Sequence, residues 1–303
     1  MSALGRRAER GRGGFRGPAS FPGIRSYTDT LVRAALAEDV GAGDVTTGAV
    51  VERGDRGRCR IIAREHMVAG GLFVAEKVFR VLDRKAVFEA HVRDGDAVRK
   101  GRALATVTGR LAALLTGERV ALNFLQRLSG IATLTGRFVG EVEGTGVEIL
   151  DTRKTTPCMR MLERYAVAAG GGVNHRFGLF DQVMVKDNHI KAAGGIAAAV
   201  ERVRARLGPE TVVEVEAANL REVKEAMGSG ADIIMLDNMT PDRVARAAEL
   251  IKGRDPEALV EVSGGVTLET VRGFALPGVD FISVGALTHS ARSVDISMEV
   301  AGR

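Results

Sequence analysis

The sequence has few residues of the kinds that carry metal, redox or base-stacking chemistry. It contains two cysteines, Cys59 and Cys158, and no tryptophan, and aromatic residues make up 4% of its 303 residues. The two cysteines are far apart and form no Cys-x-x-Cys pair, which argues against a zinc finger, a redox motif and a disulfide framework. This cysteine usage suits a reducing compartment, and we therefore expect a cytoplasmic protein.

Long apolar runs are also missing. No stretch approaches the roughly 20 apolar residues that a membrane-spanning helix needs, so no membrane association is expected. The N-terminal segment MSALGRRAERGRGGF has arginines but no apolar stretch after them, and it does not match a secretory signal. Hydrophobic residues still make up 45% of the chain, enough for one large or two modest cores.

The net charge of +5 comes from one end of the chain. Six of the 43 basic residues and one of the 38 acidic residues lie within residues 1–25, which leaves 37 of each sign for the rest. The first 25 residues are rich in glycine and arginine and poor in apolar side chains, a composition that predicts a disordered basic tail. Because the body is neutral and stacking aromatics are scarce, we expect no nucleic-acid partner.

Two different patterns of apolar residues follow this tail. Alternating patterns typical of strands are mixed with helical patterns in the first part, at residues 58–64, 85–92 and 103–109. From residue 147, short apolar runs alternate with helical segments, which indicates a parallel sheet covered on both faces. Such a sheet is either open or closed into a barrel. The Gly-x-Gly-x-x-Gly motif of open dinucleotide-binding sheets is absent after the first run.

Each of these six apolar runs ends in polar residues or glycine. The runs are VEIL, QVMV, VVEVE, DIIML, LVEVS and FISV, and their ends are Asp151–Lys154, Lys186–His189, Glu216, Asp237–Asn238, Ser263–Gly265 and Gly285–Ala286. In a barrel of parallel strands the carboxyl ends of the strands share one face, and active sites form there. The six ends therefore predict one convergent site.

The residue types in this site indicate anionic substrates. Its cations are Arg153, Lys154, His175, Arg176 and Lys186, and such a cluster repels itself unless an anion neutralises it. Arginine fits planar carboxylates, lysine suits pyrophosphate, and the glycine loops SGG and VGA offer backbone N–H groups to phosphate. Glu216 and Asp237, with substrate phosphates, are typical of a Mg²⁺ site. Asp151 either binds a ligand or orients its neighbours, and His289 either binds one or caps a helix.

At these residues the sequence resembles the quinolinate phosphoribosyltransferase family, from about residue 27 to the C-terminus. The motifs that carry the resemblance are EDVGAGDVT, ERVALNFLQRLSGIAT, DTRKTTP, GGGVNHRFGL, VKDNHI, SGG and VGALTHS. The resemblance implies an α/β fold with an N-terminal α/β sandwich domain (26–129) and an incomplete TIM-like α/β barrel (130–290). A C-terminal helix (291–303) would return to the N-terminal domain, and residues 1–25 would be the tail.

The resemblance also implies an activity and its residues. Quinolinate and 5-phosphoribosyl-1-pyrophosphate would give nicotinate mononucleotide, pyrophosphate and CO₂ in a homodimer with shared active sites. Quinolinate would be bound by Thr152, Arg153, His175, Arg176 and Lys186 and by Arg119 of the neighbouring subunit. Lys154, Glu216 and Asp237 would be catalytic, the last two near ribose and Mg²⁺. Phosphate would be bound by Ser263, Gly264, Gly265, Val284, Gly285, Ala286 and His289.

One departure and two alternatives remain. The family usually has glycine where this chain has Cys158, so a positive φ at that position would strain the backbone. The first alternative is another phosphoribosyltransferase-like enzyme, such as the relatives associated with molybdenum uptake. The second is an RNA-binding protein that uses the Arg/Gly tail. The joint presence of the five cations and Arg119 favours the dicarboxylate substrate, and the neutral body argues against RNA.

Overall fold

The computed structural model describes residue 15 and residues 17–302, and most of the predicted tail lies outside these residues. The described chain forms two compact units. Unit 1 comprises residues 137–154 and 172–286, and unit 2 comprises the described residues up to 136 together with 155–171 and 287–302. Across the described residues, no helix combines the length and the apolar character that crossing a membrane requires.

Unit 1 is built on a six-stranded parallel sheet. Its strands are β6 (Glu148–Leu150), β7 (Val183–Val185), β8 (Val213–Ala217), β9 (Ile233–Asp237), β10 (Leu259–Ser263) and β11 (Phe281–Ser283). Their order is β6-β11-β10-β9-β8-β7, so the first strand lies beside the last, as in a barrel. Within the described residues β6 and β7 are not paired, and the barrel is incomplete. The predicted parallel sheet is confirmed, with a barrel arrangement.

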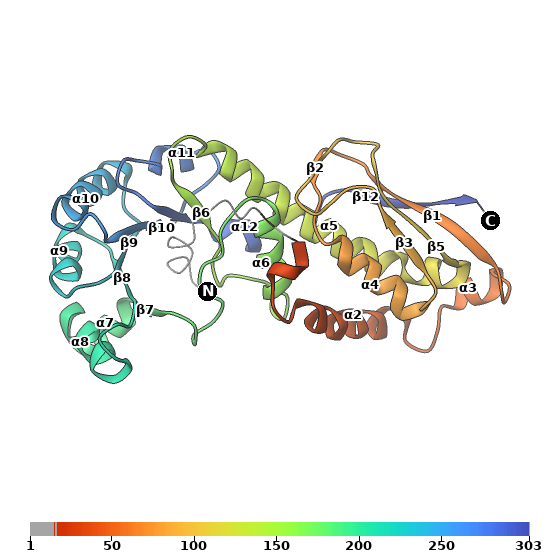
Figure 1. Ribbon diagram of the computed structural model, residues 1–303, viewed down its shortest axis with the longest axis horizontal. Coiled ribbons are helices and arrows are strands. Elements are labelled where there is room, and N and C mark those ends of the chain that lie inside the picture. The colour runs from red at the N-terminus through yellow and green to blue at the C-terminus, as the bar shows by residue number, and fades with distance from the viewer. Residues whose placement is uncertain (1–14, 16, 303) are drawn as a thin grey trace. The chain divides into compact units, whose positions relative to one another are not determined.

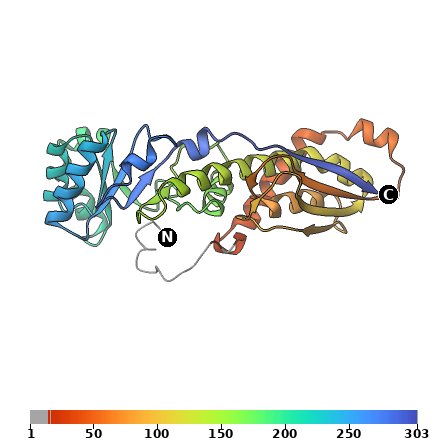
Figure 2. The same cartoon turned by 90° about the horizontal axis from the view of Figure 1, so that it is seen from above.

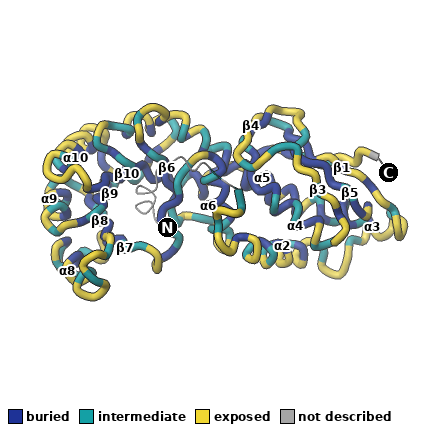
Figure 3. Tube along the Cα trace, in the orientation of Figure 1, coloured by how far each residue is buried: buried dark blue, intermediate teal, exposed yellow. Residues whose placement is uncertain are grey.

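Helices cover this sheet on its outer side, as Figure 1 shows for α8, α9 and α10. The helices of unit 1 are α7 (Asp187–Ala193), α8 (Ile196–Leu207), α9 (Leu220–Gly228), α10 (Pro241–Arg254) and α11 (Val271–Phe274). Figure 2 shows α8–α10 stacked side by side along the strands. Burial on both faces explains why most residues of these strands are apolar, and Figure 3 shows the strands as largely buried segments.

Unit 2 contains a four-stranded antiparallel sheet in the order β12-β1-β5-β3. The strands of unit 2 are β1 (Arg56–Ala63), β2 (Met67–Val68), β3 (Val87–Ala90), β4 (Ala97–Val98), β5 (Ala103–Arg110) and β12 (Ile296–Gly302). Its helices are η1 (Gly17–Ser20), α2 (Ile24–Val40), α3 (Val45–Val50), α4 (Leu72–Leu82), α6 (Arg160–Ala169) and most of α5 (Leu111–Glu141). A sheet layered with helices matches the predicted N-terminal α/β domain.

The predicted C-terminal helix (291–303) is wrong. Residues 296–302 form strand β12, which pairs antiparallel with β1. The C-terminal segment therefore does return to the N-terminal sheet, but as a strand. The β1 edge supplies backbone hydrogen-bond partners that a helix would not use. Side chains add to the pairing, because Arg64 Nε donates to Ser297 Oγ at 2.7 Å.

Two predicted domain limits also need correction. The disordered tail (1–25) is wrong for residues 17–25, because η1 and the start of α2 lie there. The rings of Phe15 and Phe21 lie 5.1 and 5.3 Å from the Tyr165 ring, so apolar side chains anchor the end of this segment. The predicted barrel domain (130–290) is not one continuous stretch, since residues 155–171, with α6, belong to unit 2.

Candidate active site

The carboxyl ends of the barrel strands align as predicted. Asp237 on β9 is in register with Ser263 on β10, which is in register with Ser283 on β11. Ser283 is in turn in register with Leu150 on β6, and Asp151 follows directly. Polar groups from four strands of unit 1 therefore meet at one edge of the sheet.

Two of the predicted cations lie close together in unit 1. Burial lowers the pKa of Arg176, and the positive charge of Arg153 lowers it further. The Arg176 guanidinium donates to the Gln182 carbonyl at 3.2 Å and is 6% exposed as a residue. Lys154 is exposed, and its backbone N–H donates to Thr152 Oγ1 at 3.1 Å, which fixes the turn after β6. The arrangement concentrates positive charge that an anionic ligand would relieve.

The predicted metal-binding carboxylates are neighbours as well. Lys186 Nζ lies 3.4 Å from Glu216 Oε2, which is buried and accepts no hydrogen bond from the described residues. Burial raises the pKa of Glu216; Lys186 opposes this effect, and the nearby Asp237 carboxylate adds to it. Two adjacent carboxylates, one of them paired with a lysine, fit a Mg²⁺ ion that also binds substrate oxygens.

The glycine loop after β10 has the backbone conformation that glycine favours. Gly264 and Gly265 have φ values of +99° and +61°, and a Cβ on Gly264 would overlap the Asn238 side chain. No helix begins directly after this loop, because α11 starts only at Val271, whereas the VGA loop leads into α12 (Ala286–His289), a single turn. Val284 N–H is also occupied, since it donates to Leu150 O at 3.0 Å. Phosphate binding here would depend on the other loop N–H groups.

His175 is the most enclosed of the predicted site residues. The ring of this residue, which is 6% exposed, has partners at both nitrogens. Nδ1 accepts the Arg176 N–H at 2.6 Å, and Nε2 lies 3.3 Å from both Glu214 Oε2 and Glu261 Oε2. The backbone is held too, because His175 N–H donates to Asp151 Oδ1 at 2.7 Å. Asp151 therefore orients its neighbours, which was one of its two predicted roles.

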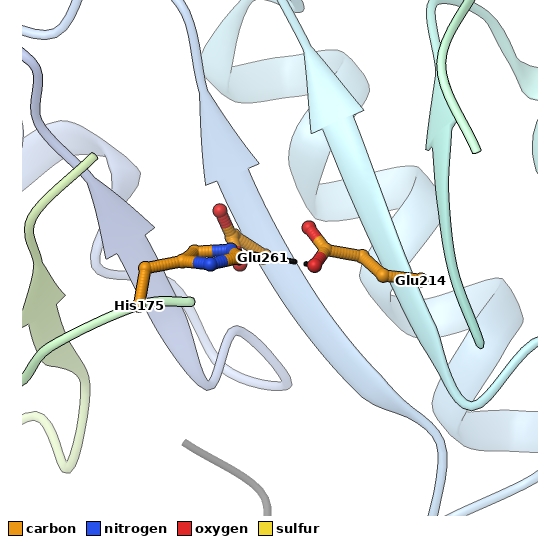
Figure 4. A group of neighbouring side chains, drawn as sticks. All are labelled: His175, Glu214 and Glu261. Atoms are coloured by element: carbon orange, nitrogen blue, oxygen red, sulfur yellow. Dashed lines mark ion pairs between the residues drawn. The ribbon is translucent and has the colours of Figure 1, made fainter. Parts of the chain in front are cut away.

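Glu214 on β8 and Glu261 on β10 were not among the predicted site residues, yet they meet His175 inside unit 1 (Figure 4). Burial lowers the pKa of His175, but the two glutamates outweigh it and raise the value to about 11. Burial and Glu261 raise the pKa of Glu214 to about 7. The raised pKa of His175 corresponds to an imidazolium between two carboxylates, whereas the raised pKa of Glu214 corresponds to a neutral ring beside one carboxylic acid. The Arg176 N–H needs the Nδ1 lone pair, which favours the neutral ring.

This cluster is also the group of described residues whose ligand atoms could surround a metal ion. The ligand atoms of His175, Glu214 and Glu261 all lie within 4.8 Å of one another. The cluster does not require an ion, however, because Gln182 Nε2 donates to Glu214 at 2.9 Å and Ser283 Oγ donates to Glu261 at 2.5 Å. The exception is Glu214 Oε1, which is buried and accepts no hydrogen bond from the described residues.

Sequence reasoning placed Asn238 at the end of the fourth apolar run but did not include it among the site residues. Asn238 has a φ of +53°, and its Nδ2 donates to Asp237 Oδ2 at 2.9 Å. Its backbone N–H donates to Ser263 O at 2.9 Å, which ties it to the neighbouring strand. An asparagine directly after a strand-end aspartate was the available signal, because asparagine tolerates the left-handed conformation better than most residues.

The remaining predicted residues belong to unit 2. Arg119 is an exposed residue of α5, and His289 is exposed at the end of α12, where its Nδ1 lies 2.6 Å from Ser290 Oγ. The roles predicted for both residues stay predictions. Cys158 has a φ of +60°, which confirms that its position requires the conformation in which the family usually has glycine. Tyr27 Oη donates to Cys158 O at 2.5 Å and holds this peptide in place.

An incomplete parallel barrel with cations, paired carboxylates and glycine loops at the ends of its strands is typical of an enzyme that binds a phosphorylated substrate. Comparison with known proteins defines the family. Residues 44–129 match the N-terminal domain of quinolinate phosphoribosyl transferase, and residues 131–299 match its C-terminal domain. The chain therefore belongs to the quinolinate phosphoribosyltransferase family.

Relatives match over nearly their whole length. The chain is 45% identical to the probable nicotinate-nucleotide pyrophosphorylase [carboxylating] of Bacillus subtilis, over 89% of this chain and 92% of that protein. It is 43% identical to the chloroplastic enzyme of that name from Arabidopsis thaliana, over 89% of this chain and 82% of that protein. The crystal structure of NadC from Streptococcus pyogenes has a TM-score of 0.85 at 42% identity, covering 89% of this chain and 95% of that one. These matches confirm the predicted family and fold.

Proposed function

We propose that this protein transfers the phosphoribosyl group of 5-phosphoribosyl-1-pyrophosphate to the ring nitrogen of quinolinate. The products are nicotinate mononucleotide, pyrophosphate and CO₂, which makes the reaction a step of de novo NAD synthesis. The observation that carries the proposal is the proximity of two like charges, the half-buried Arg153 and the buried Arg176, at the active-site edge of a barrel of this family. Two guanidinium groups that repel each other in a partly desolvated place favour the binding of an anion with two negative groups close together. Quinolinate, with two adjacent carboxylates, has that shape.

Transfer proceeds by displacement at the anomeric carbon of the ribose. The quinolinate nitrogen forms a bond to this carbon while the bond to pyrophosphate breaks, and pyrophosphate leaves with the electron pair. No protein nucleophile is needed if both substrates are held in line. Lys154, exposed at the end of β6, is suited to stabilise the charge on the departing pyrophosphate. Thr152 fixes the backbone of Lys154 through its hydroxyl group.

Decarboxylation follows without a protein-bound cofactor. After transfer, the ring nitrogen is positively charged, so the carbon–carbon bond to the adjacent carboxylate can break and leave its electrons on the ring. CO₂ departs, and that ring carbon takes up a proton from solvent. Arg153, Arg176 and Lys186 hold the substrate carboxylates during these steps, and burial of Arg176 excludes water from its carboxylate.

Glu216 and Asp237 are the residues that would hold Mg²⁺. The fit rests on the proximity of the two carboxylates, of which Glu216 is also paired with Lys186 at 3.4 Å. When bound, the ion would neutralise charge on the pyrophosphate and orient it. Asn238 would keep the Asp237 carboxylate turned toward the ion through its 2.9 Å hydrogen bond.

We also propose a homodimer with shared active sites and a location in the cytoplasm. Arg119 is an exposed cation on α5, and it supports the expectation that this residue serves the quinolinate pocket of the neighbouring subunit. Cys59 and Cys158 are both free, as is usual in a reducing compartment.

The test is the formation of nicotinate mononucleotide by the purified protein. Quinolinate, 5-phosphoribosyl-1-pyrophosphate and Mg²⁺ should give equal amounts of nicotinate mononucleotide and CO₂. Nicotinate, which lacks the second carboxylate, should react with an efficiency lower by a factor of at least about 10³, because a buried arginine would stay unpaired. Equal use of both acids would contradict the assigned pocket. No turnover of quinolinate would favour the alternative of a related phosphoribosyltransferase with another substrate.

A further inference from the structure

Two carboxylates lie inside the barrel of unit 1 without an assigned function. Glu214 on β8 is 0% exposed, and Glu261 on β10 is 1% exposed. Barrel interiors are usually filled by branched apolar side chains, and a buried carboxylate is costly unless partners compensate it. Such groups therefore require a reason within the molecule.

Their shared partner is the His175 ring. Its Nε2 lies 3.3 Å from Glu214 Oε2 and 3.3 Å from Glu261 Oε2, so glutamates from two strands contact the same ring nitrogen (Figure 4). Each glutamate is itself held, by Gln182 Nε2 at 2.9 Å and by Ser283 Oγ at 2.5 Å. The ring is thus fixed by a network whose members come from β8, β10 and β11 and from the residues just before β7.

The His175 ring in turn holds the backbone of Arg176. The Arg176 N–H donates to His175 Nδ1 at 2.6 Å, while Asp151 Oδ1 accepts the His175 N–H at 2.7 Å. Asp151 Oδ2 also accepts from Asn174 Nδ2 at 2.6 Å. Residues 174–176 are consequently fastened at the backbone by Asp151 and at the ring by the two glutamates.

We propose that Glu214 and Glu261 are positioning residues for the quinolinate pocket, which act through His175 to fix the Arg176 guanidinium where a substrate carboxylate binds. The inference rests on the proposed function, since it takes quinolinate as the ligand of Arg176. A misplaced guanidinium weakens a bidentate contact with a planar carboxylate, because that contact depends on direction. Loss of either glutamate should therefore impair quinolinate binding more than the binding of 5-phosphoribosyl-1-pyrophosphate.

The experiment compares steady-state constants of Glu214→Gln and Glu261→Gln with those of the wild-type enzyme. Glutamine keeps the size of the side chain and an acceptor oxygen but removes the carboxylate. Each variant should raise the KM for quinolinate about tenfold, while the KM for 5-phosphoribosyl-1-pyrophosphate changes less than about twofold. The milder Ser283→Ala, which removes only the hydroxyl that supports Glu261, should raise the quinolinate KM by about twofold and keeps the test available if a glutamine variant does not fold.

A double-mutant cycle with His175→Ala separates positioning from general stability. If the glutamates act through the ring, Glu261→Gln should change the quinolinate KM by less than about twofold when His175 is already alanine. Asp280→Asn is the matched control, because Asp280 is a largely buried carboxylate at the other end of a barrel strand, paired with Lys252 at 2.8 Å. This control should lower the melting temperature and leave both KM values unchanged.

Several results would overturn the inference. One is an equal rise of both KM values in the glutamine variants, and another is a full Glu261→Gln effect in the His175→Ala background. Stoichiometric zinc or another transition metal in the purified wild-type enzyme, lost in Glu261→Gln, would make the cluster a metal site instead. Failure of the proposed function is distinguishable, because the wild-type enzyme would then form no nicotinate mononucleotide from quinolinate.

Discussion

Cys158 offers a quantitative test of strain in the segment that follows Lys154. Its φ of +60° is reached freely by glycine, whereas a residue with a β-carbon reaches it at a cost of about 1–2 kcal/mol. The side chain is exposed, so replacing it forfeits no buried contact of the thiol. The conformation is held from outside the turn, because Tyr27 Oη donates to the Cys158 carbonyl at 2.5 Å.

We predict that Cys158→Gly stabilises the protein. Removing the backbone strain stabilises the folded state by about 1–2 kcal/mol. About 0.5–1 kcal/mol of this is lost again, since glycine loses more backbone freedom on folding than other residues do. The net gain in the free energy of unfolding is about 0.5–1 kcal/mol, equivalent to a rise in melting temperature of about 1–3 °C for a chain of this size. Differential scanning calorimetry of the two proteins under identical conditions measures it.

Two control variants separate the backbone effect from the thiol. Cys158→Ala removes the sulfur but keeps the β-carbon, and its melting temperature should equal that of the wild type. Cys158→Asn should lie between alanine and glycine, because asparagine tolerates the left-handed conformation better than alanine does. A glycine variant no more stable than the alanine variant would refute the reasoning. The catalytic constants of all three should stay within about twofold of wild type, since the reaction uses no thiol.

Three further predictions concern the metal site, the N-terminal segment and the subunit interface. Asn238→Ala should raise the Mg²⁺ concentration for half-maximal rate about tenfold, because the amide that orients Asp237 is lost; an unchanged Mg²⁺ titration would contradict it. Phe21→Ala should lower the free energy of unfolding by about 1–2 kcal/mol in a denaturant titration, because its ring packs on Tyr165, while Phe21→Leu should lose less. An equal mixture of Arg119→Ala and Lys154→Ala, after subunit exchange that mass spectrometry verifies, should recover about a quarter of wild-type activity, because about half of the dimers are mixed and each mixed dimer has one intact site of two. No recovery would place both residues in one chain's site.

The sequence predicts the barrel well because its signals are local. Each strand is a short apolar run between helices, a pattern that few other arrangements share, and polar residues such as Asp237 and Ser263 follow at the strand ends. Strand β12 carries no comparable local signal. Its partner β1 lies far earlier in the chain. A short segment of mixed apolar and polar residues can form either a helix or a strand, and pairing with the edge of a sheet selects the strand. Tertiary pairing decided the outcome there.

The interior glutamates Glu214 and Glu261 show what the pattern of a single strand does not predict. In VVEVE, Glu216 attracts attention as the last polar residue, and Glu214 passes for an interruption of an apolar run. Alternate residues of a strand share one face, however, so Glu214 must lie on the same side as Glu216, deeper in the barrel. The same holds for Glu261 and Ser263 on β10. A carboxylate buried this deeply is tolerated only with a partner, which here is His175. His175 lies in a loop, and the apolar patterns of the strands do not predict where a loop runs. A carboxylate two residues before the polar end of a barrel strand is therefore itself a signal that a buried cation or hydrogen-bond donor comes from elsewhere in the chain.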